Sequence, residues 1–187
     1  YVPRLASALV GRGHRVTVIT LSDSLVHDDT RYPFPVIRIL RPQPKWRRMP
    51  QTVSAIANQA RDSDLIFANG LFIESVPAAF RARKPLLMKI VGDWAWERSV
   101  NEGGVKETID EFQLKRYGWR IEALKQLRSW VTRQAQSVLT PSHYLGGIVT
   151  GWGVRPERVR VIHNALEIER PRTQVTDLPP FEGHTIV

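Results

Sequence analysis

The chain of 187 residues is 42% apolar and 24% charged, a balance typical of a globular domain, and its lack of cysteine excludes disulfide bonds and thiolate metal sites. Its 27 lysine and arginine residues outnumber 18 aspartate and glutamate residues, and the formal net charge of +9 favours anionic partners. No apolar run approaches the ~20 residues that a membrane-spanning helix needs, and no signal peptide is recognisable.

The first fifty residues predict a helix, two strands and a loop. Apolar residues at i, i+3, i+4 and i+7 from Val2 predict a helix that ends at Gly11. Runs of β-branched residues predict strands at 15–20 and 35–40. The segment 41–50 holds three prolines and several basic residues, which predicts a loop.

The middle of the chain alternates helices with strands. An apolar stripe predicts a helix over 53–60, and a second helix is expected to begin at a Ser75 cap and run to about residue 83. Strands are predicted at residues 64–69 and 85–91, each closed by a glycine, Gly70 and Gly92. The segment 94–106 is predicted to be irregular.

The last third predicts one long helix and two further strands. Apolar spacing indicates a helix over 109–135, followed by a strand at 137–140. Ser142 follows a proline and opens another helix, and a strand is predicted at 158–162. The proline-rich stretch 170–183 indicates a linker.

Strands that alternate with helices predict an α/β fold, a three-layer Rossmann-like domain with a mostly parallel sheet. Ligands of such sheets bind beyond the carboxyl ends of the strands. This rule directs attention to the segments that follow the predicted strands, at residues 20–22, 69–74, 92–97 and 140–143.

Motifs of several enzyme classes are absent. The chain has no G-x-G-x-x-G dinucleotide loop, no phosphate-binding P-loop, no H-E-x-x-H and no G-x-S-x-G. The glycine pair at 11 and 13 follows a helix and precedes a strand, the reverse of a dinucleotide-binding context. Five scattered histidines predict no metal site.

Four segments, in order along the chain, carry a family resemblance. They read YVPRLASALVGRGHRVTVIT at 1–20, KIVGDWAWE at 89–97, VLTPSHYL at 138–145 and GWGVRPERVRVIHN at 151–164. Together they resemble the N-terminal, acceptor-side domain of family 4 retaining glycosyltransferases, which have the GT-B fold.

The resemblance implies transfer of a sugar from a nucleotide diphosphate sugar to a sugar or lipid-linked acceptor, with retention at the anomeric carbon and without a metal or resident cofactor. It implies that residues 1–168 form the N-terminal domain, without its first strand, and that 169–187 are a linker and the start of a donor-binding C-terminal domain. The chain alone is therefore expected to be inactive.

Asp93 is the candidate catalytic residue. It follows a predicted strand and Gly92, so its carboxylate is expected at the carboxyl edge of the sheet, where it would orient an acceptor hydroxyl or stabilise positive charge. Many family members have a histidine in this loop, and Gly92 stands at that position. The alternative is that Asp93 caps the next helical turn.

Six residues at the predicted strand ends are candidate substrate-binding residues: Gly70, Glu74, Gly92, Trp94, Glu97 and Ser142. Tryptophan rings stack on sugar faces and carboxylates accept hydroxyl hydrogen bonds, but tryptophans also serve as packing anchors. Glu74 follows the end of a predicted strand, and a simple surface carboxylate is the preferred explanation for it. Ser142 is equally explained as a helix N-cap.

A basic aromatic segment is a candidate membrane contact. Lys45, Arg47 and Arg48 flank Trp46, which suits an anionic membrane surface or a phosphorylated lipid. A solvated loop explains the same residues. A cytoplasmic protein, with or without peripheral contact at the inner membrane surface, fits these features.

Two rival functions stay open. The first is a non-enzymatic basic module that binds anionic ligands or nucleic acid, although no nucleic-acid motif is present and nucleic acid is not an expected partner. The second is a GT-B nucleotide-sugar epimerase, because fold alone does not decide function.

Overall fold

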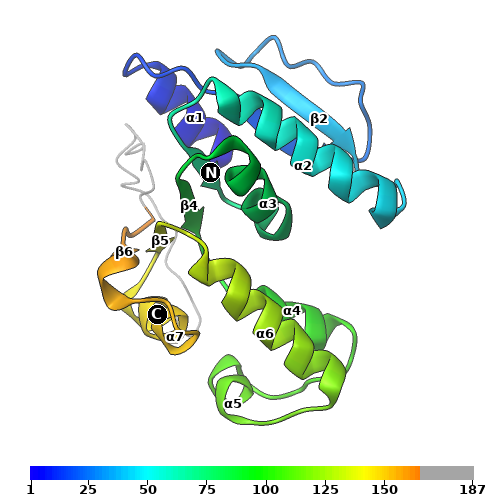
Figure 1. Cartoon of the computed structure of the whole chain (residues 1–187), viewed down its shortest axis with the longest axis vertical. Coiled ribbons are helices and arrows are strands. Elements are labelled where there is room, and N and C mark those ends of the chain that lie inside the picture. The colour runs from blue at the N-terminus through cyan, green and yellow to red at the C-terminus, as the bar shows by residue number, and fades with distance from the viewer. Residues whose placement is uncertain (165–187) are drawn as a thin grey trace, which may run out of the picture.

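The computed structural model describes residues 1–164, whose strands form two parallel sheets (Figure 1). In the small sheet β1 (Val18–Ser22) pairs with β2 (Val36–Leu40). The larger sheet has the order β3 (Ile66–Ala68), β4 (Leu86–Lys89), β5 (Ser137–Thr140) and β6 (Val159–Val161). The predicted α/β fold with parallel strands is thereby confirmed.

Helices connect and cover these strands. They are α1 (Val2–Val10), α2 (Lys45–Arg61), α3 (Phe72–Ala82), α4 (Trp94–Asn101), α5 (Ile109–Leu114), α6 (Trp119–Arg133) and α7 (His143–Gly151), with a short 3-10 turn at Pro156–Arg158. None of the helices in residues 1–164 is long and apolar enough to cross a membrane.

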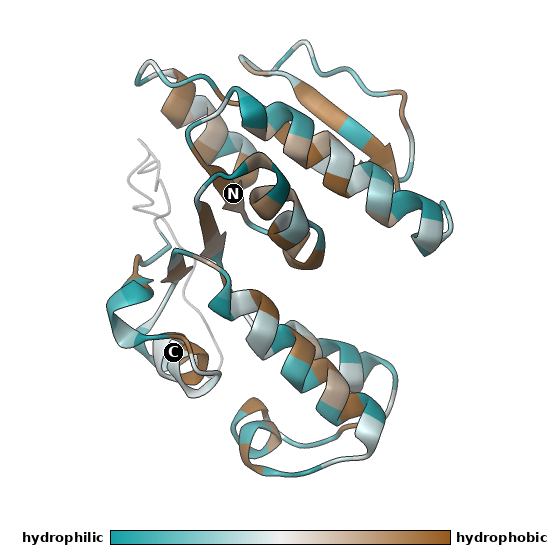
Figure 2. Cartoon of the chain, viewed as in Figure 1, coloured by the Kyte–Doolittle hydropathy of each residue, from teal (hydrophilic) through white to brown (hydrophobic). Residues whose placement is uncertain are grey.

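The main core lies on one face of the larger sheet. Met88 and Ile90 pack there with Val76 of α3, Val131 of α6 and Val149 of α7, all of them at most 1% exposed. Figure 2 shows the strands as mainly hydrophobic and the helices as striped. Because side chains alternate along a strand, Lys89 lies on the opposite face, where Tyr1 at the start of α1 contacts it.

A second cluster joins the two sheets. Ile56 and Ala57 of α2 and Ala78 of α3 are buried, and Ile19 of β1 and Ile66 of β3 pack against them. The small sheet is therefore held to the larger one through the α2–α3 pair, whose close packing is visible in Figure 1.

Two segments that were predicted to lack helix are helical. Residues 45–50 belong to α2, because the packing of Ile56 and Ala57 holds the helix although Pro50 inside it lacks a backbone N–H to donate. Residues 94–101 form α4, because Asp93 accepts hydrogen bonds from the backbone N–H groups of Ala95 and Trp96.

Two helix boundaries also differ from the prediction. The expected single helix over 109–135 is broken between Leu114 and Trp119, where Lys115 leaves the helical conformation and Gly118 starts α6. The helix expected to begin at Ser75 begins at Phe72, and Ser75 is buried inside it. The predicted linker at 170–183 lies outside the described residues.

The end of α3 supplies a test of this fold. Arg83 closes the helix with φ 55° and ψ 43°, a left-handed conformation that costs a non-glycine residue about 1 kcal/mol. We expect Arg83→Gly to raise the free energy of unfolding by up to about 1 kcal/mol, measured by urea denaturation. Arg81→Gly, inside the same last turn, is the control and should lower it by about 1 kcal/mol.

Candidate functional site

The carboxyl ends of β3, β4 and β5 bring the predicted site residues to one edge of the larger sheet. Gly70 and Glu74 follow β3, the Gly92–Glu97 segment follows β4, and Ser142 follows β5. Since these strands are parallel neighbours, the three segments lie in a row with the β4 segment in the middle.

Asp93 lies inside the protein beneath this edge. Its side chain is 0% exposed. One carboxylate oxygen, Oδ1, accepts the N–H groups of Ala95 at 3.0 Å and Trp96 at 3.3 Å. The other, Oδ2, accepts from Gln113 Nε2 at 3.0 Å and forms an ion pair with Nη1 of Arg128. Both oxygens are thus occupied by partners within the protein.

The ion pair extends into a network around Gln113. Its Oε1 accepts from Nη1 of Arg128 at 3.2 Å and from the indole N–H of Trp152 at 2.9 Å. The Arg128 guanidinium carbon lies 4.2 Å from the centre of the Trp152 ring, a cation–π contact. Burial lowers the pKa of the Arg128 guanidinium, and Asp93 acts in the opposite direction.

This geometry matches the alternative in which Asp93 caps a helix. A carboxylate with 0% exposure and four hydrogen-bonding partners does not reach a substrate in this conformation. A catalytic role for Asp93 stays a prediction. What the contacts support is a positioning role, because Asp93 holds the start of α4 against α5 and α6.

Gly92, just before α4, and Glu97, in the first turn of α4, lie together at the surface. The Glu97 side chain folds back over Gly92, where a Cβ atom at residue 92 would overlap the carboxylate. Glu97 is exposed, whereas Asp93 is buried. Glu97 is therefore the carboxylate of this segment that a ligand in solvent can reach.

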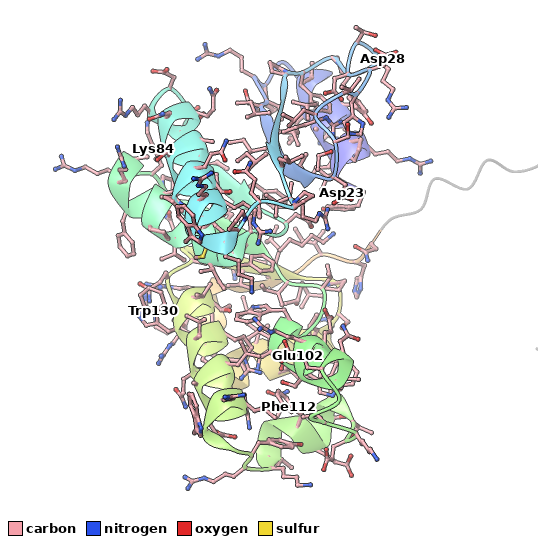
Figure 3. The ribbon with its side chains drawn as sticks, turned by 90° about the vertical axis from the view of Figure 1, so that its right-hand side faces the viewer. Asp23, Asp28, Lys84, Glu102, Phe112 and Trp130 are labelled. Atoms are coloured by element: carbon pink, nitrogen blue, oxygen red, sulfur yellow. The ribbon has the colours of Figure 1, made fainter. Side chains whose placement is uncertain are left out.

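The two tryptophans of α4 are packed inward. Trp94 and Trp96 are half-buried against the cluster of Ala95, Val105 and Phe112, and Figure 3 shows Phe112 among the lower helices. Trp96 donates its indole N–H to the Glu107 carbonyl at 2.9 Å. The Trp94 indole N–H is buried without a hydrogen-bond partner. The packing role of both rings is evident, and sugar stacking by Trp94 stays a prediction.

The segment after β3 is conformationally strained. Leu71 has φ 53° and ψ 35°, a left-handed conformation that is uncommon for a leucine. Glu74 lies in the first turn of α3 and is only 9% exposed, so its interpretation as a surface carboxylate is wrong. Its negative charge is favoured there by the helix dipole.

Ser142 acts as the N-cap of α7. Its hydroxyl accepts the N–H of Leu145 at 3.2 Å. Beside it, a hollow of about 440 Å³ is lined by seven residues of α7, β6 and the adjoining turn together with His143 and His163. The two imidazole rings meet edge to face, with centres 6.1 Å apart.

Lys89 is the residue that the sequence interpretation missed. It is the last residue of β4 and is 4% exposed. Its Nζ donates to Oδ1 of Asn164 at 2.9 Å and lies 3.4 Å from the centre of the Tyr1 ring. The sequence feature that could have drawn attention to Lys89 is its position as the one charged residue in an otherwise apolar strand.

Within residues 1–164, no group of three or more histidine, aspartate or glutamate side chains is arranged to hold a metal ion.

We expect the Asp93–Arg128 pair to be a major source of stability. Asp93→Asn keeps the cap but removes the charge, and Arg128→Met leaves Asp93 unpaired, so each should lower the free energy of unfolding by about 3 kcal/mol. The double variant should lose less than the sum of the two. Arg120→Met on the exposed first turn of α6 should change stability by less than about 0.5 kcal/mol. Additive losses would contradict direct pairing.

Solved structures with a similar fold include Anabaena HepE. Its complex with UDP-glucose matches with a TM-score of 0.58 and 18% identity, covering 89% of this chain and 40% of HepE. Its complex with UDP and glucose matches with a TM-score of 0.53 and 18% identity, covering 80% and 37%. The chain therefore spans less than half the length of HepE, and at this identity the likeness shows the fold.

No curated protein matches the chain significantly. The family model described as Glycosyltransferase Family 4, in contrast, matches residues 1–170. This match covers the whole described structure, including the four segments that carry the resemblance, at 1–20, 89–97, 138–145 and 151–164. The chain belongs to Glycosyltransferase Family 4.

Proposed function

We propose that this chain is the acceptor-side, N-terminal half of a retaining GT-B glycosyltransferase. The observation that carries the proposal is the family match over residues 1–170, together with the row of polar residues at the carboxyl edge of the larger sheet. The enzyme would transfer a sugar from a nucleotide diphosphate sugar, which is a co-substrate, to a sugar or lipid-linked acceptor. Family membership favours this function over a basic binding module or an epimerase.

We propose that the nucleotide sugar donor binds to a second domain, separate from the acceptor side. HepE, which is more than twice as long as the matched region, has been crystallised with UDP-glucose. We propose that residues 1–168 form the acceptor-side domain, that 169–187 lead into the donor-side domain, and that transfer requires both. The identity of the transferred sugar and of its nucleotide would then depend largely on residues outside this chain.

A further strand is proposed between the two sheets. Within residues 1–164, β1 pairs only with β2 and β3 pairs only with β4, so one edge of each strand has no strand partner. The Ile19 and Ile66 side chains of these two strands pack on the same α2–α3 cluster. A parallel strand from a preceding segment would join the sheets into one and satisfy the backbone groups of both edges.

Within the acceptor side we assign roles by exposure. Glu97 would accept a hydrogen bond from an acceptor hydroxyl, because it is exposed and lies over Gly92 at the end of β4. Asp93 would act on the reaction by holding that segment in place. Gly70, Glu74, Trp94 and Ser142 would shape the surrounding rim, with Ser142 organising the N-terminus of α7.

The role of Glu97 can be tested in the complete enzyme. Glu97→Gln should lower kcat/KM for the acceptor about tenfold, because a hydrogen bond to a charged acceptor group contributes about 1.5 kcal/mol more than the amide would retain. The KM for the donor should not change. Glu102→Gln, in which an exposed carboxylate past the end of α4 is altered, should have wild-type kinetics. An unchanged kcat/KM in Glu97→Gln would remove Glu97 from the acceptor site.

We also propose that the first turn of α2 contacts an anionic membrane surface. Trp46 is 70% exposed, and the Arg47 guanidinium lies over its ring at 4.6 Å. Lys45 is exposed, and the first turn contains no acidic residue. An aromatic ring among cations at a positive helix end suits the interface of an anionic bilayer.

Vesicle co-sedimentation tests this contact. Replacing Lys45 and Arg47 by glutamine should weaken binding to vesicles of mixed phosphatidylglycerol and phosphatidylcholine about tenfold or more, at ~1 kcal/mol per basic residue. The same loss of charge at Arg81 and Arg83, which are exposed at the end of α3, is the control and should leave binding unchanged. Equal weakening by both pairs would indicate a nonspecific effect of net charge.

A further inference from the structure

A buried lysine at the carboxyl end of β4 has no counter-charge in the described structure. Lys89 is 4% exposed. Among residues 1–164, no carboxylate forms an ion pair with its Nζ. Its partners there are a neutral amide oxygen of Asn164 at 2.9 Å and the face of the Tyr1 ring at 3.4 Å. An ammonium group has three N–H donors, and one hydrogen bond to the protein leaves two of them.

The other two buried cations among residues 1–164 each have a charged partner. Arg128 pairs with Asp93, and Lys125 pairs with Glu122 while donating to a backbone carbonyl. Buried charges are generally paired because an unpaired ion loses its hydration without compensation. Lys89 departs from this pattern at the edge of the sheet where ligands of parallel α/β folds bind.

The surroundings of Lys89 increase the positive potential. Tyr1 immediately precedes α1, and the first turn of that helix contains no acidic residue. The backbone N–H groups at a helix start carry partial positive charge, which adds to the charge of the ammonium. Two positive features close together, without an acidic neighbour in contact, favour an anion.

We infer that Lys89 binds an anionic oxygen of a substrate, either a phosphate of the nucleotide sugar or an acidic group of the acceptor. The inference rests on the proposed function, since it takes the carboxyl edge of the larger sheet as the substrate side. Lys89 would donate one of its remaining N–H groups to that oxygen. The Asn164 amide and the Tyr1 ring would hold the ammonium in place before the substrate arrives, which reduces the entropy cost of binding.

Inorganic pyrophosphate is the probe for this site. Calorimetry with the chain should show binding that Lys89→Met weakens at least about tenfold, the loss expected for a charge-assisted hydrogen bond. Lys89→Arg keeps the positive charge and should bind pyrophosphate more tightly than Lys89→Met does. Lys84→Met is the matched control, because Lys84 lies just before β4, at the opposite edge of the sheet, and it should bind like the wild type.

Binding of UDP and uridine distinguishes the two sources of the anion. If the donor diphosphate is the ligand, UDP should bind the complete enzyme more tightly than uridine does, and Lys89→Met should remove most of that difference. If UDP binding is unaffected while pyrophosphate binding falls, the anion belongs to the acceptor. Both results support an anion site at Lys89.

Two results would overturn the inference. One is a Lys89→Met chain that has the circular dichroism spectrum of the wild type and binds pyrophosphate equally well. If Lys89→Met does not fold, a nuclear magnetic resonance titration of the wild type decides, and pyrophosphate that shifts neither Lys89 nor Asn164 would contradict the site. A complete Lys89→Met enzyme with normal donor and acceptor KM would refute this inference but leave the proposed transferase function intact.

Discussion

The buried ion pair between Asp93 and Arg128 is the interaction on which the lower half of the molecule depends. Asp93 begins α4 by capping its first N–H groups, and the same carboxylate meets a guanidinium from α6 and an amide from α5. One side chain thereby holds α4, α5 and α6 together. Because the Asp93 carboxylate is fully buried, losing Arg128 would leave an uncompensated charge inside the protein. The segment after β4 is thereby anchored at Asp93, and Glu97 lies in the first turn of the helix that Asp93 caps.

The charged residues of the site differ in whether they are paired within the protein. Asp93 and Arg128 neutralise each other inside, whereas Glu97 reaches solvent, and Lys89 is buried with only neutral partners among residues 1–164. The paired charges have a structural explanation within the chain. Glu97 and Lys89 have no such explanation in the described part of the chain, and both lie at the edge of the sheet where a substrate would be placed. Charged side chains without a partner in the protein are better candidates for a functional role than paired ones.

Some elements of the fold could be predicted from local sequence patterns, whereas others depended on tertiary packing. The strands around Ile66, Met88 and Val138 were predictable, because short β-branched or apolar runs between turn residues have few alternatives. The start of α2 was not predictable, because the prolines at 44 and 50 and the basic residues between them favour a loop until Ile56 packs on α3. The burial of Glu74 and Lys89 was equally hidden, since a charged residue at a strand or helix end is usually solvated.

By itself, the sequence determined the alternation of strands and helices, and hence a parallel sheet with one ligand-binding edge, because periodicity and turn chemistry are local properties. It also placed Asp93, Glu97 and Ser142 at that edge. Only the tertiary structure decided which of these side chains faces solvent. Arg128 lies 35 residues from Asp93, and Asn164 lies 75 residues from Lys89. No local pattern encodes such pairings, since they form only when distant helices and strands pack together.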